Sequence, residues 1–221
     1  MRTLGLAAIV HGAAGSPYLW YLSRASGLVL LVLLSAVVVL GVAARMGSSP
    51  ANWPRFVFVE LHRTLALFAV ALLALHVVTA LLDPFVSIGW YSVALPFLSA
   101  YRPAQIGLGA IAVDLGGAVI VTSLLRVRIG FRIWRLVHWL AYLAWPAAFV
   151  HSLTAGDDLS IWWAALIESL CAFAVLTAVI ARLIFVVLGK ASSATPTASA
   201  LPPEIPADFF DRDQPHWRVH R

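Results

Sequence analysis

Four histidines stand in apolar stretches of the sequence, where they could bind a metal or a cofactor. His62 and His76 are fourteen residues apart on one stretch, and His138 and His151 are thirteen residues apart on another. At a rise of about 1.5 Å per residue, a helix would separate the members of each pair by about 20 Å. Each stretch therefore places one imidazole near each of its ends, and the two stretches together indicate two stacked sites.

The elements that must position these histidines are membrane-spanning helices. The 221-residue chain is 62% hydrophobic, far more than a soluble domain requires. No charged side chain occurs from Thr64 to Leu82, which is long enough to cross a bilayer core as a helix. The composition predicts an all-α, polytopic membrane helix bundle. Its five spanning helices are expected at about 18–44, 56–82, 104–125, 133–153 and 159–188.

Charge in the connecting segments predicts the orientation of the chain. Arginines concentrate in 45–63 and 126–135, whereas the opposite side carries fewer arginines together with Asp83, Asp157 and Asp158. Basic residues favour the cytoplasmic side of a membrane. We therefore expect a multi-pass protein of the bacterial plasma membrane with its N-terminus outside and its C-terminus inside. The net charge of +5 is explained in this way and does not indicate nucleic-acid binding.

Residues 84–101 are apolar but are interrupted by Gly89 and Pro96. A sixth crossing here would turn the arginine-rich 126–135 segment outward, so we expect an interfacial or re-entrant segment on the outer side. After Lys190 the composition changes to Ser, Thr, Ala and Pro, which is typical of disorder. The expected organisation is an extracytoplasmic N-terminus (1–17), a transmembrane domain that carries the four histidines (18–190) and a disordered cytoplasmic tail (191–221).

The haem assignment follows from the number of ligands at each level. The second and fourth spans run in the same direction, so His62 and His138 are expected near the inner face, and His76 and His151 near the outer face. A structural zinc site needs four protein ligands and a catalytic one three. A haem supplies four ring nitrogens itself and accepts two axial imidazoles. The sequence therefore predicts two haems, one held by each pair, so that residues 18–190 form a transmembrane haem-binding domain.

Arginines near the histidines could pair with the anionic propionates of haem. Arg63 and Arg135 are candidates at the inner site, and Arg24 and Arg102 at the outer one. Each of the four is explained about equally well as an ordinary residue at the edge of a membrane span.

The thirteen-residue spacing in the fourth span does not suit an ideal helix. Thirteen residues at about 100° each leave His151 roughly 140° away from the direction of His138. Pro146 lies between them and predicts a kink that re-aims the second imidazole.

These motifs resemble the ferric reductase-like transmembrane domain family over about residues 18–190. The family includes the haem cores of NADPH oxidases and ferric reductases and the membrane haem subunit of periplasmic methionine sulfoxide reductase. The resemblance implies two b-type haems bound by the pairs His62/His138 and His76/His151. The matching motifs are Leu61-His62-Arg63 with His76, Thr122-Ser123 with Arg126, and Trp134-Arg135 with His138-Trp139, Tyr142 and His151.

NADPH oxidases and ferric reductases continue into a flavin and nicotinamide domain, but no G-x-G-x-x-G motif follows the last span here. We therefore expect electrons to come from a cytoplasmic flavin reductase carrying FAD or FMN, or from a membrane quinol, and to pass to an extracytoplasmic acceptor. The chain would be either an oxidoreductase or an electron-transfer subunit.

Other functions stay open at this point. Within the same class, the acceptor could be a periplasmic repair reductase. From another class, a haem-free transporter could use the histidines with Asp114 and Glu168 to line a cation path, and a purely structural membrane subunit is a third reading. The simplest role of both acids is an interhelical hydrogen bond, with proton movement as the alternative.

Overall fold

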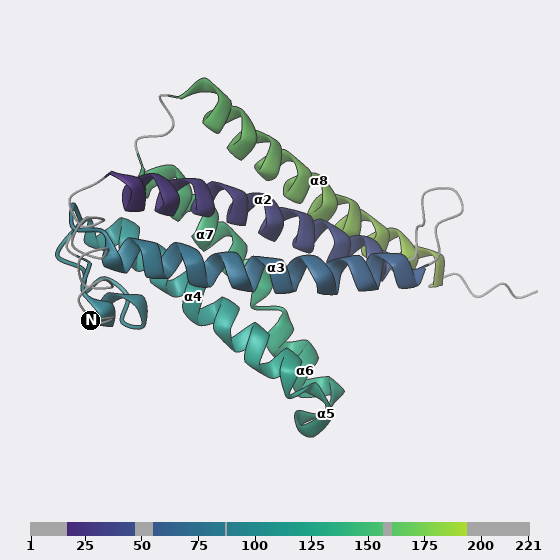
Figure 1. Ribbon diagram of the computed structural model, residues 1–221. Coiled ribbons are helices and arrows are strands. Elements are labelled where there is room, and N and C mark those ends of the chain that lie inside the picture. Colours follow the sequence, from purple (N-terminus) through teal and green to yellow (C-terminus); the bar gives the residue numbers. More distant parts are fainter. Residues whose placement is uncertain (1–16, 47–54, 87, 157–160, 194–221) are drawn as a thin grey trace, which may run out of the picture. The chain divides into compact units, whose positions relative to one another are not determined.

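The computed structural model describes residues 17–46, 55–86, 88–156 and 161–193. All regular structure in these ranges is helical (Figure 1), which confirms the all-α fold. The elements are α2 (Tyr18–Met46), α3 (Arg55–Leu82), the 3-10 helix η1 (Trp90–Val93), α4 (Pro103–Leu124), α5 (Arg126–Ile129), α6 (Phe131–His138), α7 (Ala141–Ala155) and α8 (Trp162–Ser193).

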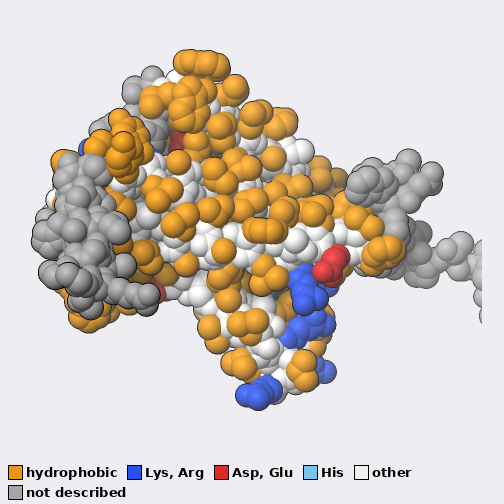
Figure 2. Space-filling model, viewed as in Figure 1, with side chains coloured by type: hydrophobic (Ala, Val, Ile, Leu, Met, Phe, Trp, Pro, Cys, Tyr) orange, Lys and Arg blue, Asp and Glu red, His pale blue; other side chains and the backbone are white. Residues whose placement is uncertain are grey.

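Five helical segments in the described ranges are long and apolar enough to cross a membrane, as the sequence predicts. They are Tyr18–Met46, Phe56–Leu82, Pro103–Leu124, Phe131–Ala155 and Trp162–Leu188. Hydrophobic side chains cover much of the visible surface (Figure 2), and many large ones are exposed, such as Leu67, Phe68 and Phe173. An apolar surface of this extent is unfavourable in water. The chain is therefore a multi-pass membrane protein with lipid around its helices.

The fourth span has an interruption that the sequence does not predict. Pro146 lies inside α7, and the helix breaks instead at Trp139 and Leu140. Around this break the N–H groups donate to carbonyls three residues earlier, from Leu140 to Val137 and from Leu143 to Leu140, each at 2.9 Å. Such turns advance a side chain by about 120° per residue instead of about 100°. About five such residues add about 100° of rotation in total. This is most of the roughly 140° by which an ideal helix would turn His151 away from the direction of His138.

The segment between α3 and α4 is not one of the spans. Its described residues form η1, turns and bends, and η1 packs against α4. This is the non-spanning behaviour expected for 84–101. The side chain of Ser92, in η1, is buried.

Two of the helices that carry the histidines each pack along a neighbour without one, α3 along α2 and α7 along α4. A buried cluster of Leu31, Trp145, Cys171 and Val175 joins α2, α7 and α8. The indole Nε1 of Trp145 donates a hydrogen bond of 2.9 Å to Ser35 Oγ, so the polar edge of this buried ring is satisfied.

The chain divides into one unit up to Arg182 and another from Leu183 onward. All contacts of the histidine site lie within the first unit. The predicted N-terminal segment 1–17 and tail 191–221 fall almost entirely outside the described residues, so those limits stay predictions.

Candidate functional site

The structure brings the four histidines together in two pairs. The ring centres of His62 and His138 are 6.3 Å apart, with an angle of 61° between the ring planes. Those of His76 and His151 are 6.4 Å apart, with an angle of 78°. In each pair, one ring comes from α3 and the other from the span formed by α6 and α7. Because fourteen helical residues separate the two α3 histidines, the two levels are about 21 Å apart along that helix.

Three of the four rings are fixed by a backbone carbonyl on a neighbouring helix. The Nδ1 atoms of these rings donate to a carbonyl at 2.7–2.9 Å. A carbonyl oxygen only accepts hydrogen bonds, so Nδ1 carries the proton and a neutral ring keeps its lone pair on Nε2. This is the usual arrangement of metal-binding histidines, in which the non-ligating nitrogen is oriented by a protein acceptor. The bonds join His62 to Val37, His76 to Ser23, and His151 to Gln105.

A glycine lies against each of these three rings, one helical turn after the carbonyl that the ring binds. A Cβ atom added to the glycine would lie closer to Cε1 of the imidazole than ordinary packing allows. The distance would be 3.3 Å for His62, 2.9 Å for His76 and 2.8 Å for His151. The absence of a side chain thus lets the ring reach the backbone of the neighbouring helix. The glycines are Gly41 against His62, Gly27 against His76, and Gly109 against His151.

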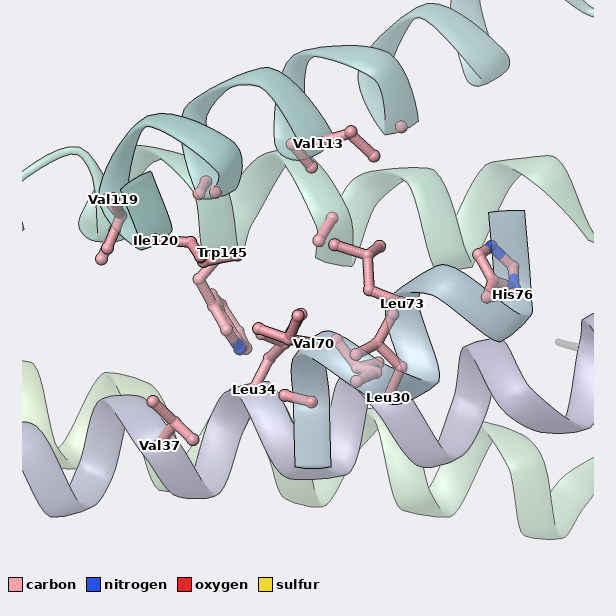
Figure 3. A pocket seen from close by; sticks show the side chains of 18 of the residues that line it. Leu30, Leu34, Val37, Val70, Leu73, His76, Val113, Val119, Ile120 and Trp145 are labelled. Carbon is pink, nitrogen blue, oxygen red and sulfur yellow. The ribbon is translucent and has the colours of Figure 1, made fainter. Parts of the chain in front are cut away.

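One large cavity connects the two levels. Its volume is about 1140 Å³, and all four histidines line it, whereas typical small-molecule sites have about 300–1,000 Å³. Between the two levels the lining is mostly apolar, and Figure 3 shows Val70, Leu73 and Trp145 among the side chains that line it. The cavity therefore suits large, flat and largely apolar ligands.

The arginines named from the sequence are placed differently from one another. Arg24, Arg63 and Arg135 line the cavity. The Arg24 guanidinium also packs against Gly156 and lies 5.5 Å from the ring centre of Trp20. Arg102 is not among the lining residues, and its Nη1 donates to the carbonyls of Thr154 and Ala155, at 3.3 Å each. It holds the last turn of α7, directly after His151.

Sequence reasoning missed the part that α8 plays. Arg182 lines the cavity, donates from Nη1 to the hydroxyl of Tyr142 at 2.7 Å, and lies 4.8 Å from the ring centre of Trp139. An arginine within a largely apolar span was a signal for it, since such residues rarely face lipid. Arg126, which also lines the cavity, lies 4.6 Å from the ring centre of Trp134.

The two membrane acids have different surroundings. Glu168 on α8 is buried and accepts a hydrogen bond of 2.7 Å from Ser152 Oγ on α7, which is the expected interhelical contact. Its Oε2 has no partner among the described residues. Asp114 on α4 is exposed on the helix surface. Within the described ranges, no three His, Cys, Asp or Glu side chains group so as to hold a metal ion, and each histidine pair offers two protein ligands.

Two facing histidine pairs that line one mostly apolar cavity, among helices long enough to span a membrane, define a polytopic membrane protein with a large internal binding site. The family model of the ferric reductase like transmembrane component matches residues 26–149, more than half of the chain, and the chain belongs to this family. The match includes three of the four histidines and ends two residues before His151. No curated protein and no solved structure matches the chain significantly. Membership indicates transmembrane electron transfer, and domains of this family generally bind haem.

Proposed function

We propose that the chain holds two b-type haems, one between His62 and His138 and one between His76 and His151, and carries single electrons across the membrane. The observation that carries the proposal is the spacing of the rings. Two imidazoles that bind one metal ion from opposite sides would have ring centres about 6.2–6.4 Å apart, from metal–nitrogen bonds of about 2.0–2.1 Å and about 1.1 Å between nitrogen and ring centre. The measured separations are 6.3 and 6.4 Å.

The surroundings of the rings also fit a haem. Three rings keep Nε2 as the ligating nitrogen, because their Nδ1 atoms donate to carbonyls. A haem that brings four nitrogens of its own needs only the two protein ligands that each level offers. Haem iron bound in this way supplies one-electron transfer and needs no open coordination position.

Basic side chains at the cavity would bind the anionic edges of the cofactors. Arg24, Arg63 and Arg135 are the candidates from the sequence that line the cavity, and Arg182 joins them. Arg102 has a supporting role in this proposal, since it binds the last carbonyls of the helix that carries His151. Charge-assisted hydrogen bonds from arginine to carboxylate are among the stronger polar contacts in proteins.

The direction of transfer follows from the charge of the two faces. Exposed arginines on α5 and α6 gather at one end of the first unit (Figure 2), and the positive-inside tendency places this end in the cytoplasm. The donor would be a cytoplasmic flavin reductase or a membrane quinol. The acceptor would lie outside, next to the pair of His76 and His151. The N-terminus is then outside and the C-terminus inside, in a plasma membrane.

Single histidine variants test the pairing. We expect two haems per purified chain, with His76→Ala and His151→Ala each losing the same haem, because each haem needs both of its imidazoles. Haem content and reduced-minus-oxidised spectra measure this, and His216→Ala, beyond the fifth span, serves as the control that keeps both. A colourless protein would refute the proposal, as would loss of the same haem in His76→Ala and His138→Ala.

A further inference from the structure

His138 differs from the other three histidines. Its Nδ1 is buried and has no hydrogen-bond partner among the described residues, whereas the other three Nδ1 atoms each bind a carbonyl. An unpartnered polar group in an apolar setting is unfavourable. Three of the four histidines thus have a carbonyl partner and an adjacent glycine, and among the described residues His138 has neither.

The register of α4 indicates which residues correspond to this arrangement at the inner level. On this helix, Gln105 supplies the carbonyl and Gly109 the open space for His151. The inner level lies about fourteen residues further along, as it does on α3. Fourteen residues after Gln105 and Gly109 are Val119 and Ser123. The Val119 carbonyl therefore corresponds to that of Gln105, and Ser123 takes the position of the glycine.

At these positions the carbonyl is already bound and a side chain replaces the glycine. Ser123 Oγ donates to the Val119 carbonyl at 2.6 Å, whereas the nearest acceptor of Thr122 Oγ1 is the Ala118 carbonyl, at 2.7 Å. Trp134 Nε1 in turn donates to Ser123 Oγ at 3.3 Å, and its ring centre lies 5.0 Å from that of His138. The Ser123 hydroxyl thus uses the oxygen that corresponds, at this level, to the carbonyl that binds His151 at the outer level.

We infer that Ser123 is a positioning residue that keeps His138 without a carbonyl partner, and that it thereby makes the two haem sites electrochemically different. The inference rests on the proposed function, because His138 must be a haem ligand. A carbonyl that accepts from Nδ1–H raises the basicity of the imidazole and strengthens its bond to the more highly charged, oxidised iron. Without that acceptor, the inner site favours the reduced state relative to the outer site.

The size of the effect follows from the range known for such supporting contacts. Removing an outer partner of a metal-binding histidine changes affinity by about 10–100-fold. If the supporting contact changes only the affinity for the oxidised iron, a tenfold change in that affinity shifts the midpoint potential of a one-electron couple by about 59 mV.

Ser123→Gly tests the inference, because it frees a lone pair of the Val119 carbonyl and opens the space that glycine provides elsewhere. We expect the midpoint potential of the inner haem to fall by about 59 mV or more, with that of the outer haem unchanged. The inner haem is the one lost in His62→Ala. Ser169→Gly is the matched control, because Ser169 Oγ makes the same bond to the carbonyl four residues earlier and is exposed.

The outcomes are distinguishable from failure of the proposed function. Two bound haems with both midpoints unchanged in Ser123→Gly overturn this inference alone, whereas a wild-type protein without haem overturns the proposed function. If Ser123→Gly does not accumulate, Ser123→Ala removes the hydroxyl and keeps the helix. A smaller fall of the same midpoint in Ser123→Ala then supports the inference, and an unchanged midpoint overturns it.

Discussion

The closest of the glycine–histidine contacts gives the sharpest steric test. A Cβ atom added at Gly109 would lie 2.8 Å from Cε1, 2.9 Å from Nδ1 and 3.1 Å from Nε2 of His151. The substitution Gly109→Ala therefore meets three atoms of a ring that is also bound to the backbone. Gly117 on the same helix offers a matched control, since a Cβ atom there would meet nothing within 4 Å.

The expected loss can be worked out from these distances. Carbon atoms pack at about 3.5–4.0 Å, so the ring must move by about 0.7 Å or more. The hydrogen bond from Nδ1 to Gln105 is 2.7 Å long, and a shift of this size away from the carbonyl brings it near the limit for such bonds. Loss of this support lowers affinity by about 10–100-fold, or about 1.4–2.8 kcal/mol.

The assay is the haem content of purified Gly109→Ala and Gly117→Ala proteins, together with a titration in which added haem restores the spectrum. We expect Gly109→Ala to bind the haem of His76 and His151 more weakly, while Gly117→Ala keeps both. Replacing glycine with alanine favours a helix by up to about 1 kcal/mol, so general destabilisation is not an explanation. Equal haem affinity in the two variants would refute the steric argument.

Two further predictions use the same measurement of haem per chain. Gly27→Ala places its methyl group 2.9 Å from Cε1 of His76, and Gly41→Ala places one 3.3 Å from Cε1 of His62; the first should lose more haem than the second, and the reverse order would contradict this graded clash. Pro146→Ala should retain both haems, because α7 runs through this position and the restored N–H can complete a helical hydrogen bond. Loss of one haem in Pro146→Ala would show that the proline aims a ligand.

The number and type of the spans could be predicted because hydropathy over about twenty residues is a strong signal. The position of the break in the fourth span could not. Pro146 is the usual sign of a kink, but membrane helices tolerate proline when neighbouring groups satisfy the freed carbonyl. Trp139 and Leu140 carry no comparable signal. The break there comes from the packing that brings two rings of one span toward the same side.

The neighbouring positions of the histidines could be expected from the direction of the spans, but their supporting contacts were overlooked. A signal was present, since Gly27 and Gly41 are fourteen residues apart, the same spacing as His62 and His76. Because α2 and α3 pack along their length, equal spacings on the two helices place one glycine at each histidine. The carbonyls that bind Nδ1 leave no such trace, since every residue carries one.

The position of His138 at the end of a helix completes the contrast between the two levels. His138 is the last residue of α6 and directly precedes the break, whereas His151 lies within α7. A residue inside a helix is held by hydrogen bonds on both sides, and His151 also has its carbonyl and its glycine. His138 stands at the end of α6, and among the described residues it has neither a carbonyl partner for Nδ1 nor a glycine against its ring. A change in α6, which also carries the exposed Arg132 and Arg135, therefore acts on His138 more directly than on the other three histidines.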